Sequence, residues 1–128
     1  MSSIDISASG LAAQRVRMDL IAENLANADT TRTANGGAYQ RLQAVLESDA
    51  TDGGVNVSAV VADPNMPPRV YRPGHPDADS AGYVQMPNVD SVEEMVDLVT
   101  ASRTFEANIT AIDASKAMTR QALELSRG

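Results

Sequence analysis

The stretch SVEEMVDLVTASRTFEANITAIDASKAMTRQALELSR, residues 91–127, contains neither proline nor glycine. Its apolar and small residues recur with the spacing of one face of a helix. These positions are Met95, Leu98, Ser102, Phe105, Ile109, Ile112, Thr119 and Leu123. At 1.5 Å per residue the stretch predicts one helix of about 50 Å. Such a helix is longer than the small middle region of the chain could cover. We expect Ser91 to cap this helix, with Glu94 completing a capping box.

A second helical stripe lies at the N-terminus. Its apolar residues recur every seven positions, with alanines and Ile21 beside them, which predicts an amphipathic helix. The heptad positions are Ile4, Leu11, Met18 and Leu25. We expect Ser2 or Ser3 to cap the start of this helix. It should end near Asn27, where a polar and glycine-rich sequence begins.

The sequence between the two stripes is typical of short strands and turns. Residues 39–46, 55–61, 69–72 and 82–86 alternate or are rich in β-branched residues, and Asp52-Gly53-Gly54 predicts a turn between the first two. All 6 prolines fall in residues 64–87, which rules out long, regular strands there. We predict a mainly α fold with coiled-coil-like helices over 1–33 (with a turn) and 88–128, and a small β-rich, partly irregular insert over 34–87.

Composition excludes several classes of function. A net charge of −7 with a single lysine argues against binding nucleic acid or an anionic membrane surface. The absence of cysteine excludes disulfides, thiolate metal sites and cysteine nucleophiles. No stretch approaches the ~20 apolar residues of a membrane span. The N-terminus also lacks the basic and apolar regions of a cleaved signal peptide. We therefore expect no nucleic acid partner and no membrane insertion.

One segment resembles a catalytic or metal site. His75 is followed by Asp77 and Asp79, and a histidine with two carboxylates can bind a metal or act as a base. The surrounding proline, glycine and aspartate already account for an ordered turn, and His75 is the only histidine. A metal-dependent hydrolase is the enzyme alternative, which stoichiometric metal in the purified protein would favour. We predict no catalytic residue, no metal and no cofactor.

The end of the first helix carries a polar cluster with two interpretations. Asn24 and Asn27 lie three residues apart on one helical face, and Thr30 and Thr31 follow. These side chains could satisfy the free carbonyls and amides at the end of the helix. They could instead become ordered by hydrogen bonds to a neighbouring subunit. The sequence does not decide between the two.

Several segments are similar to those of known families. GLAAQRVRM at 10–18, IAENLAN at 21–27 and TTRT at 30–33 resemble the N-terminal signature of flagellar axial proteins. With them, seven further segments resemble the basal-body rod protein of the C type, a proximal rod component, over nearly the whole chain. They are PGHPDAD at 73–79, GYV at 82–84, PNV at 87–89, EEMV at 93–96, SR at 102–103, EAN at 106–108 and KAM at 116–118. Ala38, where proline is expected, and the variable stretch 49–54 depart from the pattern in loops only.

The resemblance implies a structural role without catalysis or a cofactor. The terminal helices would line an axial tube with the insert facing outward, transmitting torque and leaving a channel for later exports. The partners would be copies of the chain, other rod proteins, the MS-ring and rod-adaptor proteins at the base, and the flagellar type III export apparatus. The chain would be exported unfolded, without signal cleavage, and would assemble in the periplasm.

From the stripes and the resemblance we expect a seam between helices of neighbouring subunits. Its residues are Leu11, Met18, Ile21, Leu25, Leu98, Phe105, Ile109, Ile112 and Leu123. Asn24, Asn27, Thr30 and Thr31 would then lock the turn after the first helix against a neighbour. A helical adaptor or export-chaperone-like binding module is the alternative, because it would offer the same stripes to a foreign client. The two functions predict different assemblies. A rod subunit should form oligomers or fibres with its rod relatives, whereas an adaptor should form a stable one-to-one complex with its client.

Overall fold

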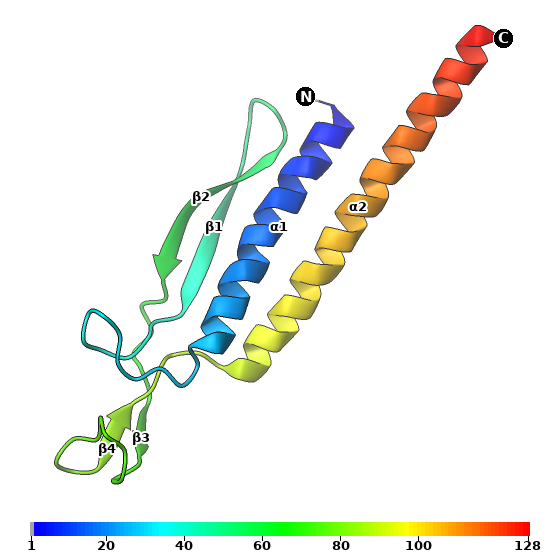
Figure 1. Ribbon diagram of the computed structural model, residues 1–128. Coiled ribbons are helices and arrows are strands. Elements are labelled where there is room, and N and C mark those ends of the chain that lie inside the picture. Colours follow the sequence, from blue (N-terminus) through cyan, green and yellow to red (C-terminus); the bar gives the residue numbers. More distant parts are fainter. Residues whose placement is uncertain (1) are drawn as a thin grey trace.

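Along the sequence, one long helix precedes four short strands and a second, longer helix follows them. The computed structural model describes residues 2–128. The elements are α1 (Ser3–Ala26), β1 (Leu42–Ser48), β2 (Val55–Ala62), β3 (Arg69–Tyr71), β4 (Tyr83–Gln85) and α2 (Ser91–Arg127) (Figure 1). The predicted mainly α fold, with long terminal helices around a small strand-containing middle, is confirmed.

Local hydrogen bonds fix where the helices begin and end. The Ser2 hydroxyl accepts a bond from the Asp5 amide, and the Asp5 carboxylate accepts one from the Ser2 amide, which makes a capping box. Asn27 ends α1 as expected. The prediction that Ser91 caps α2 is wrong. The Asp90 carboxylate accepts from the amides of residues 92 and 93, so Ser91 is already the first helical residue.

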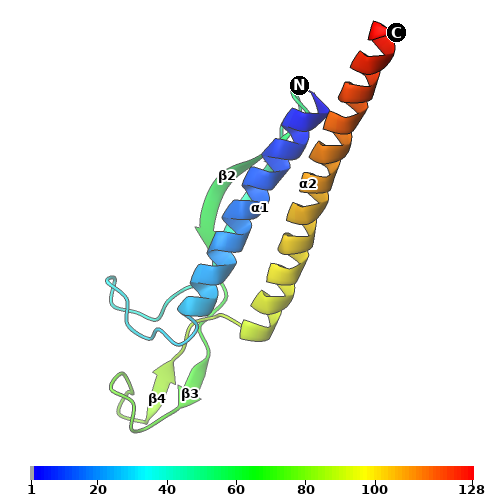
Figure 2. The ribbon, with the colours of Figure 1, turned by 45° about the vertical axis from the view of Figure 1, so that its right-hand side comes forward.

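The two helices lie side by side and run antiparallel (Figures 1 and 2). The Ser3 and Ser115 hydroxyls are 3.3 Å apart, and a Cβ on Gly10 would lie 3.0 Å from Asn108 Nδ2. The seven residues from Ser3 to Gly10 thus match the seven from Ser115 back to Asn108. The next fourteen along α1 reach Asn24, which bonds Glu94, fourteen residues further back along α2. Contacts that repeat in multiples of seven are those of a coiled coil.

The strands form two separate antiparallel hairpins. β1 pairs with β2, with an irregularity between Val45 and Leu46, and β3 pairs with β4. The β1–β2 turn contains Gly53 at φ +76°, a conformation that favours glycine. This hairpin packs along α1 on the side away from α2 (Figure 1), and the Ser9 hydroxyl accepts a 3.0 Å bond from the Val55 amide.

The apolar core of the single chain is very small. Its buried apolar residues are Ala13, Ile21, Val84, Met86 and Ala101. Among residues 2–128, fifteen large apolar residues are exposed, from Ile6 in α1 to Leu125 near the end of α2. One chain therefore buries only part of its apolar stripes. Within residues 2–128, no helix is both long and apolar enough to cross a membrane.

Candidate assembly interface

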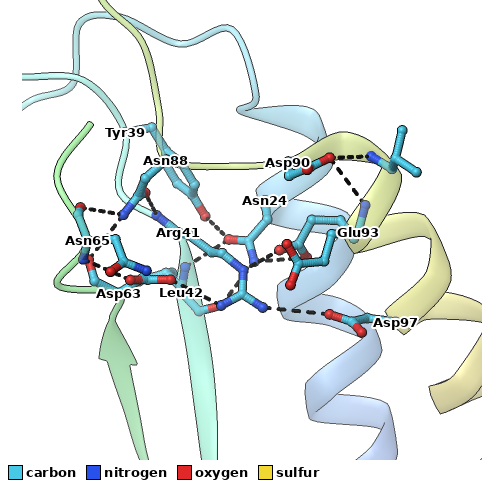
Figure 3. Close-up of polar contacts among 12 residues, drawn as sticks. Asn24, Tyr39, Arg41, Leu42, Asp63, Asn65, Asn88, Asp90, Glu93 and Asp97 are labelled. Atoms are coloured by element: carbon cyan, nitrogen blue, oxygen red, sulfur yellow. Dashed lines mark hydrogen bonds and ion pairs between the residues drawn. The ribbon is translucent and has the colours of Figure 1, made fainter. Parts of the chain in front are cut away.

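A buried asparagine joins α1 to β1. The Asn24 side chain is 0% exposed. Its amide nitrogen donates to the Leu42 carbonyl at 2.9 Å and to the Glu94 carboxylate at 3.3 Å. Its oxygen accepts from the Leu42 amide at 2.9 Å and from the Tyr39 hydroxyl at 2.8 Å (Figure 3). All the bonding capacity of this side chain is therefore used inside the chain.

Arg41, which shares the Glu94 carboxylate with Asn24, binds three acidic side chains. Arg41 donates from Nε to the carboxylate of Glu94, which is 1% exposed. Its terminal nitrogens lie 3.3 Å from Asp63 Oδ2 and 3.7 Å from Asp97 Oδ2 (Figure 3). The planar guanidinium suits this role because it donates in several fixed directions. Arg41 thus ties α2 to the segment that follows β2.

Asn88 completes the cluster from the segment before α2. Its side-chain oxygen accepts from the Arg41 amide at 2.7 Å, and its nitrogen donates to the carbonyls of Asp63 and Asn65 at 3.2 and 2.9 Å. We call the set Asn24, Tyr39, Arg41, Asp63, Asn88 and Glu94 the junction cluster. It holds both helices and the strand-containing middle of the chain at one point.

The surroundings of the junction cluster shift the pKa values of two of its residues, Tyr39 and Arg41. Burial, followed by the negative charges of Glu23 and Glu94, raises the pKa of Tyr39 above its usual 10.0. Burial on its own lowers the pKa of Arg41, but its bonds to the carboxylates of Glu94 and Asp63 outweigh burial and raise that pKa further. Tyr39 and Arg41 are therefore locked as a neutral donor and a cation at neutral pH.

The segment after α1 is tied to the turn before β4. The Thr31 hydroxyl donates to Asp77 Oδ2 at 2.6 Å, and Arg32 pairs with the other oxygen of Asp77. The Thr31 bond, and then the Arg32 bond, hold the pKa of Asp77 below its usual 3.8. His75 Nδ1 accepts a 3.0 Å bond from the Asp77 amide. These bonds match the turn that we predicted for the segment.

The carboxylates that follow His75 are used in separate contacts. Asp79 pairs with Arg69 at 2.6 Å and also accepts from the amides of Ala81 and Tyr83. Across residues 2–128, no three histidine, aspartate or glutamate side chains are grouped so that they could hold a metal ion. The hydrolase alternative therefore has no assembled site in the described part of the chain.

The structure divides the predicted interface residues into three groups. Ile21 and Asn24 are buried within the chain. Nine others are partly exposed, namely Leu11, Met18, Leu25, Asn27, Thr30, Thr31, Leu98, Phe105 and Ile112. Ile109 and Leu123 are exposed. Asn27 and Thr30 also bond each other at 3.0 Å, and Asn27 donates to the Glu23 carbonyl. Because Asn24 and Ile21 serve the fold of the single chain, we leave them out of the interface proposed below.

Within residues 2–128, two apolar surfaces of α2 are largely exposed. One is the α2 strip, which consists of Val92, Met95, Val96 and Val99, each more than half exposed. The other is the α2 overhang, residues 116–127, which continues past the start of α1 (Figure 2). All residues of the overhang are exposed, including Met118, Leu123 and Leu125. The overhang was not predicted, because the lengths of the helices do not give their register.

The sequence also did not reveal the role of Arg41 and Glu94. They are 53 residues apart, and Glu94 has an equally good local explanation as part of a helix cap. The only available signal was a lone arginine at the start of a predicted strand. The side chains of the junction cluster come from four separate segments. They therefore have no regular spacing in the sequence from which the cluster could be predicted.

Comparison with known proteins agrees with these features. Residues 4–32 match the family described as Flagella basal body rod protein, and residues 80–125 match the family described as Flagellar basal body rod FlgEFG protein C-terminal. The flagellar basal-body rod protein FlgC of Bacillus subtilis (strain 168) is 43% identical over 98% of this chain and 97% of its own.

Two further relatives carry the same name. FlgC of Salmonella typhimurium (strain LT2) is 42% identical over 99% of this chain and 98% of its own. FlgC of Borreliella burgdorferi is 40% identical over 99% and 97%. This similarity covers both helices, the hairpins and the junction cluster. The chain therefore belongs to the FlgC family of flagellar basal-body rod proteins and is a structural subunit of the rod.

Proposed function

We propose that the chain builds the proximal rod by burying its terminal helices against copies of itself and other rod proteins. The helices line an axial tube through which later exports pass, and the strand-containing insert faces outward. The observation that carries this proposal is the α2 overhang, a stretch of helix whose large apolar side chains Met118, Leu123 and Leu125 are more than half exposed in the described chain. Isolated helical ends are marginal in water, so this segment needs a neighbour to be stable.

The proposed interface follows the exposed and half-exposed parts of the stripes. It contains Leu11, Met18, Leu25, Leu98, Phe105, Ile109, Ile112 and Leu123, with Asn27, Thr30 and Thr31 at the turn after α1. The junction cluster keeps the insert fixed to the helices. Torque applied to the helices is thereby passed to the insert through hydrogen bonds and ion pairs. No catalytic activity is part of this function.

The small core supports export and late folding. Five buried apolar residues stabilise the isolated chain little against the conformational entropy of ordering it. A weakly folded chain suits passage through the flagellar type III apparatus, without a cleaved signal, before assembly in the periplasm. The MS-ring and rod-adaptor proteins are its partners at the base.

A pair of overhang variants tests this function. Leu123→Asp places a charge on the apolar overhang, at a side chain that is 58% exposed within the described chain. Gln121→Asp adds the same charge at an exposed polar position two residues away. We expect Leu123→Asp to abolish incorporation into basal bodies and motility, and Gln121→Asp to retain both. Full motility and normal incorporation of Leu123→Asp would contradict the proposal.

The adaptor alternative predicts a different complex. An adaptor would leave its client after delivery, so it would be absent from purified basal bodies. It would also form a stable one-to-one complex with a foreign helix. Presence of the chain in purified rods excludes the adaptor, and its absence there excludes the rod subunit.

A further inference from the structure

The α2 overhang forms one side of a groove with a basic rim. Where α2 passes the start of α1, Ile4, Thr119 and Leu123 line an open groove of about 300 Å³, together with Lys116 and Arg120. Ser3 lies opposite Ser115, and Ile4 is the residue of α1 that lines this groove, so most of the overhang extends past α1. The overhang carries three bases, Lys116, Arg120 and Arg127, against one acid, Glu124. It is therefore an apolar surface with net positive charge.

The α2 strip has the opposite charge. Glu94 and Ala101, seven residues apart, are buried on the side of α2 that faces α1. At 3.6 residues per turn, Val96 and Val99 fall on the opposite side of the helix. The strip lines a groove of about 450 Å³ that also includes Thr100 and Arg103.

Acidic side chains surround this strip. Glu94 and Asp97 are already used by Arg41. The remaining charges of residues 90–106 are three acids against one base: Asp90, Glu93 and Glu106, and Arg103. Among the described residues, none of these four side chains takes part in an ion pair within the chain. The strip is therefore an apolar surface with net negative charge.

The two surfaces cannot meet within one molecule. Val96 and Thr119 lie on the same helix, 23 residues apart, which is about 35 Å at 1.5 Å per residue. A contact between them must join two molecules. Because one partner uses its overhang and the other its strip, the contact is heterologous and each molecule keeps one surface free for the next.

We propose that the α2 overhang of one copy docks on the α2 strip of a second copy, with Leu123 and Thr119 against Val96 and Val99. The bases of the overhang then lie beside Glu93 and Glu106 of the neighbour. This inference rests on the proposed function, because it assumes that the chain assembles with its own kind. It adds which surface meets which, and an axial offset of about 35 Å between neighbours.

Cysteine cross-linking tests the contact directly, because the chain has no cysteine of its own. Val96→Cys and Thr119→Cys are each introduced singly and together, and Ala107→Cys, at an exposed position outside both surfaces, is the control partner. Assembled basal bodies are oxidised and separated without reductant. We expect disulfide dimers when Val96→Cys and Thr119→Cys are co-expressed, and longer products from the double variant. Pairs with Ala107→Cys should remain monomeric.

Charge reversal tests why these surfaces pair. Lys116, which the 23-residue offset places beside Glu93 of the neighbour, is the base to reverse: Lys116→Glu should lower the yield of the 96–119 disulfide about two- to fivefold, as expected for one exposed ion pair. Glu93→Arg on the partner copy should restore it. If no 96–119 disulfide forms in rods that contain the chain, the docking inference is wrong while the proposed function stands. If the chain is absent from purified rods, the proposed function itself fails.

Discussion

Arg41 and Glu94 form the central ion pair of the molecule although 53 residues separate them in sequence. Glu94 is almost fully buried and Arg41 is about one-fifth exposed, so the pair is protected from solvent. Asn24 donates to the other oxygen of the same carboxylate. The pair therefore connects α2 with the start of β1 and, through Asn24, with α1. Because the apolar core of the chain is so small, the junction cluster contributes much of the contact between its elements.

Removing Arg41 should destabilise the chain strongly. Arg41→Met keeps the bulk of the side chain but leaves the Glu94 carboxylate buried beside Asp63 without its cation. We expect the free energy of unfolding to fall by about 3 kcal/mol, as for other broken buried pairs. Urea denaturation followed by circular dichroism measures the change. Arg32→Met is the matched control, because Arg32 pairs with Asp77 at the surface, and it should cost less than about 1 kcal/mol. Equal effects of the two variants would contradict the central role of Arg41.

Asn24 should matter far more than Asn27, three residues further on. Asn24→Ala leaves the Leu42 amide and carbonyl and the Tyr39 hydroxyl without their partner in a buried site. We expect a loss of about 2 to 3 kcal/mol in the free energy of unfolding. Asn27→Ala removes bonds at a partly exposed helix end and should cost about 1 kcal/mol or less. The same denaturation experiment compares them, and a larger loss for Asn27→Ala would be evidence against the observed bonds.

The register of the two helices can be tested at Gly10. Gly10→Ala should gain up to about 1 kcal/mol from helix propensity, but its new methyl group would lie 3.0 Å from Asn108 Nδ2. In an Asn108→Ala background this crowding is gone, so the gain should appear there in full. A double-mutant cycle measures the coupling between the two positions. No coupling would show that these residues do not face each other.

Asp77 should titrate below the usual aspartate range because of Thr31. A carboxyl group whose pKa is lower in the folded chain adds stability above its unfolded value of about 3.8. That stability is lost as the pH falls through the lower, folded pKa. Thr31→Val should raise the pKa of Asp77 towards 3.8, while Thr33→Val, nearby in the same segment, should leave it unchanged. Carbon-detected NMR titration of the carboxyl groups measures both, and an Asp77 midpoint unmoved by Thr31→Val would contradict the assigned bond.

Local signals in the sequence predicted the helices well and the contacts between them poorly. The cap of α1, its end at Asn27 and the turn at Gly53 each depend on a few neighbouring residues. The end and the turn are found as expected, and of the two serines predicted as caps the structure uses Ser2. The α2 cap was misassigned by one residue, because Asp90 and Ser91 are both good capping residues and only the backbone geometry decides between them.

The junction cluster and the α2 overhang depend on positions far apart in the chain. Asn24 was recognised as unusual, but its partners at Tyr39, Leu42 and Glu94 carry no shared sequence pattern. The overhang follows from the heptad register between α1 and α2, which places Ser3 opposite Ser115. Hydrophobic period shows that a helix has an apolar face, but it does not show which part of another helix covers that face.

Amide hydrogen exchange of residues 116–127, in dilute purified chain and in purified basal bodies, tests most directly whether these helices find cover only in the rod. In the dilute chain, we predict rapid exchange in the overhang and slower exchange near the junction cluster, where the helices are held together. In basal bodies, we predict that exchange in the overhang slows markedly because neighbouring helices bury it. Strong protection of the overhang in the dilute chain, or equally fast exchange in both samples, would contradict the account.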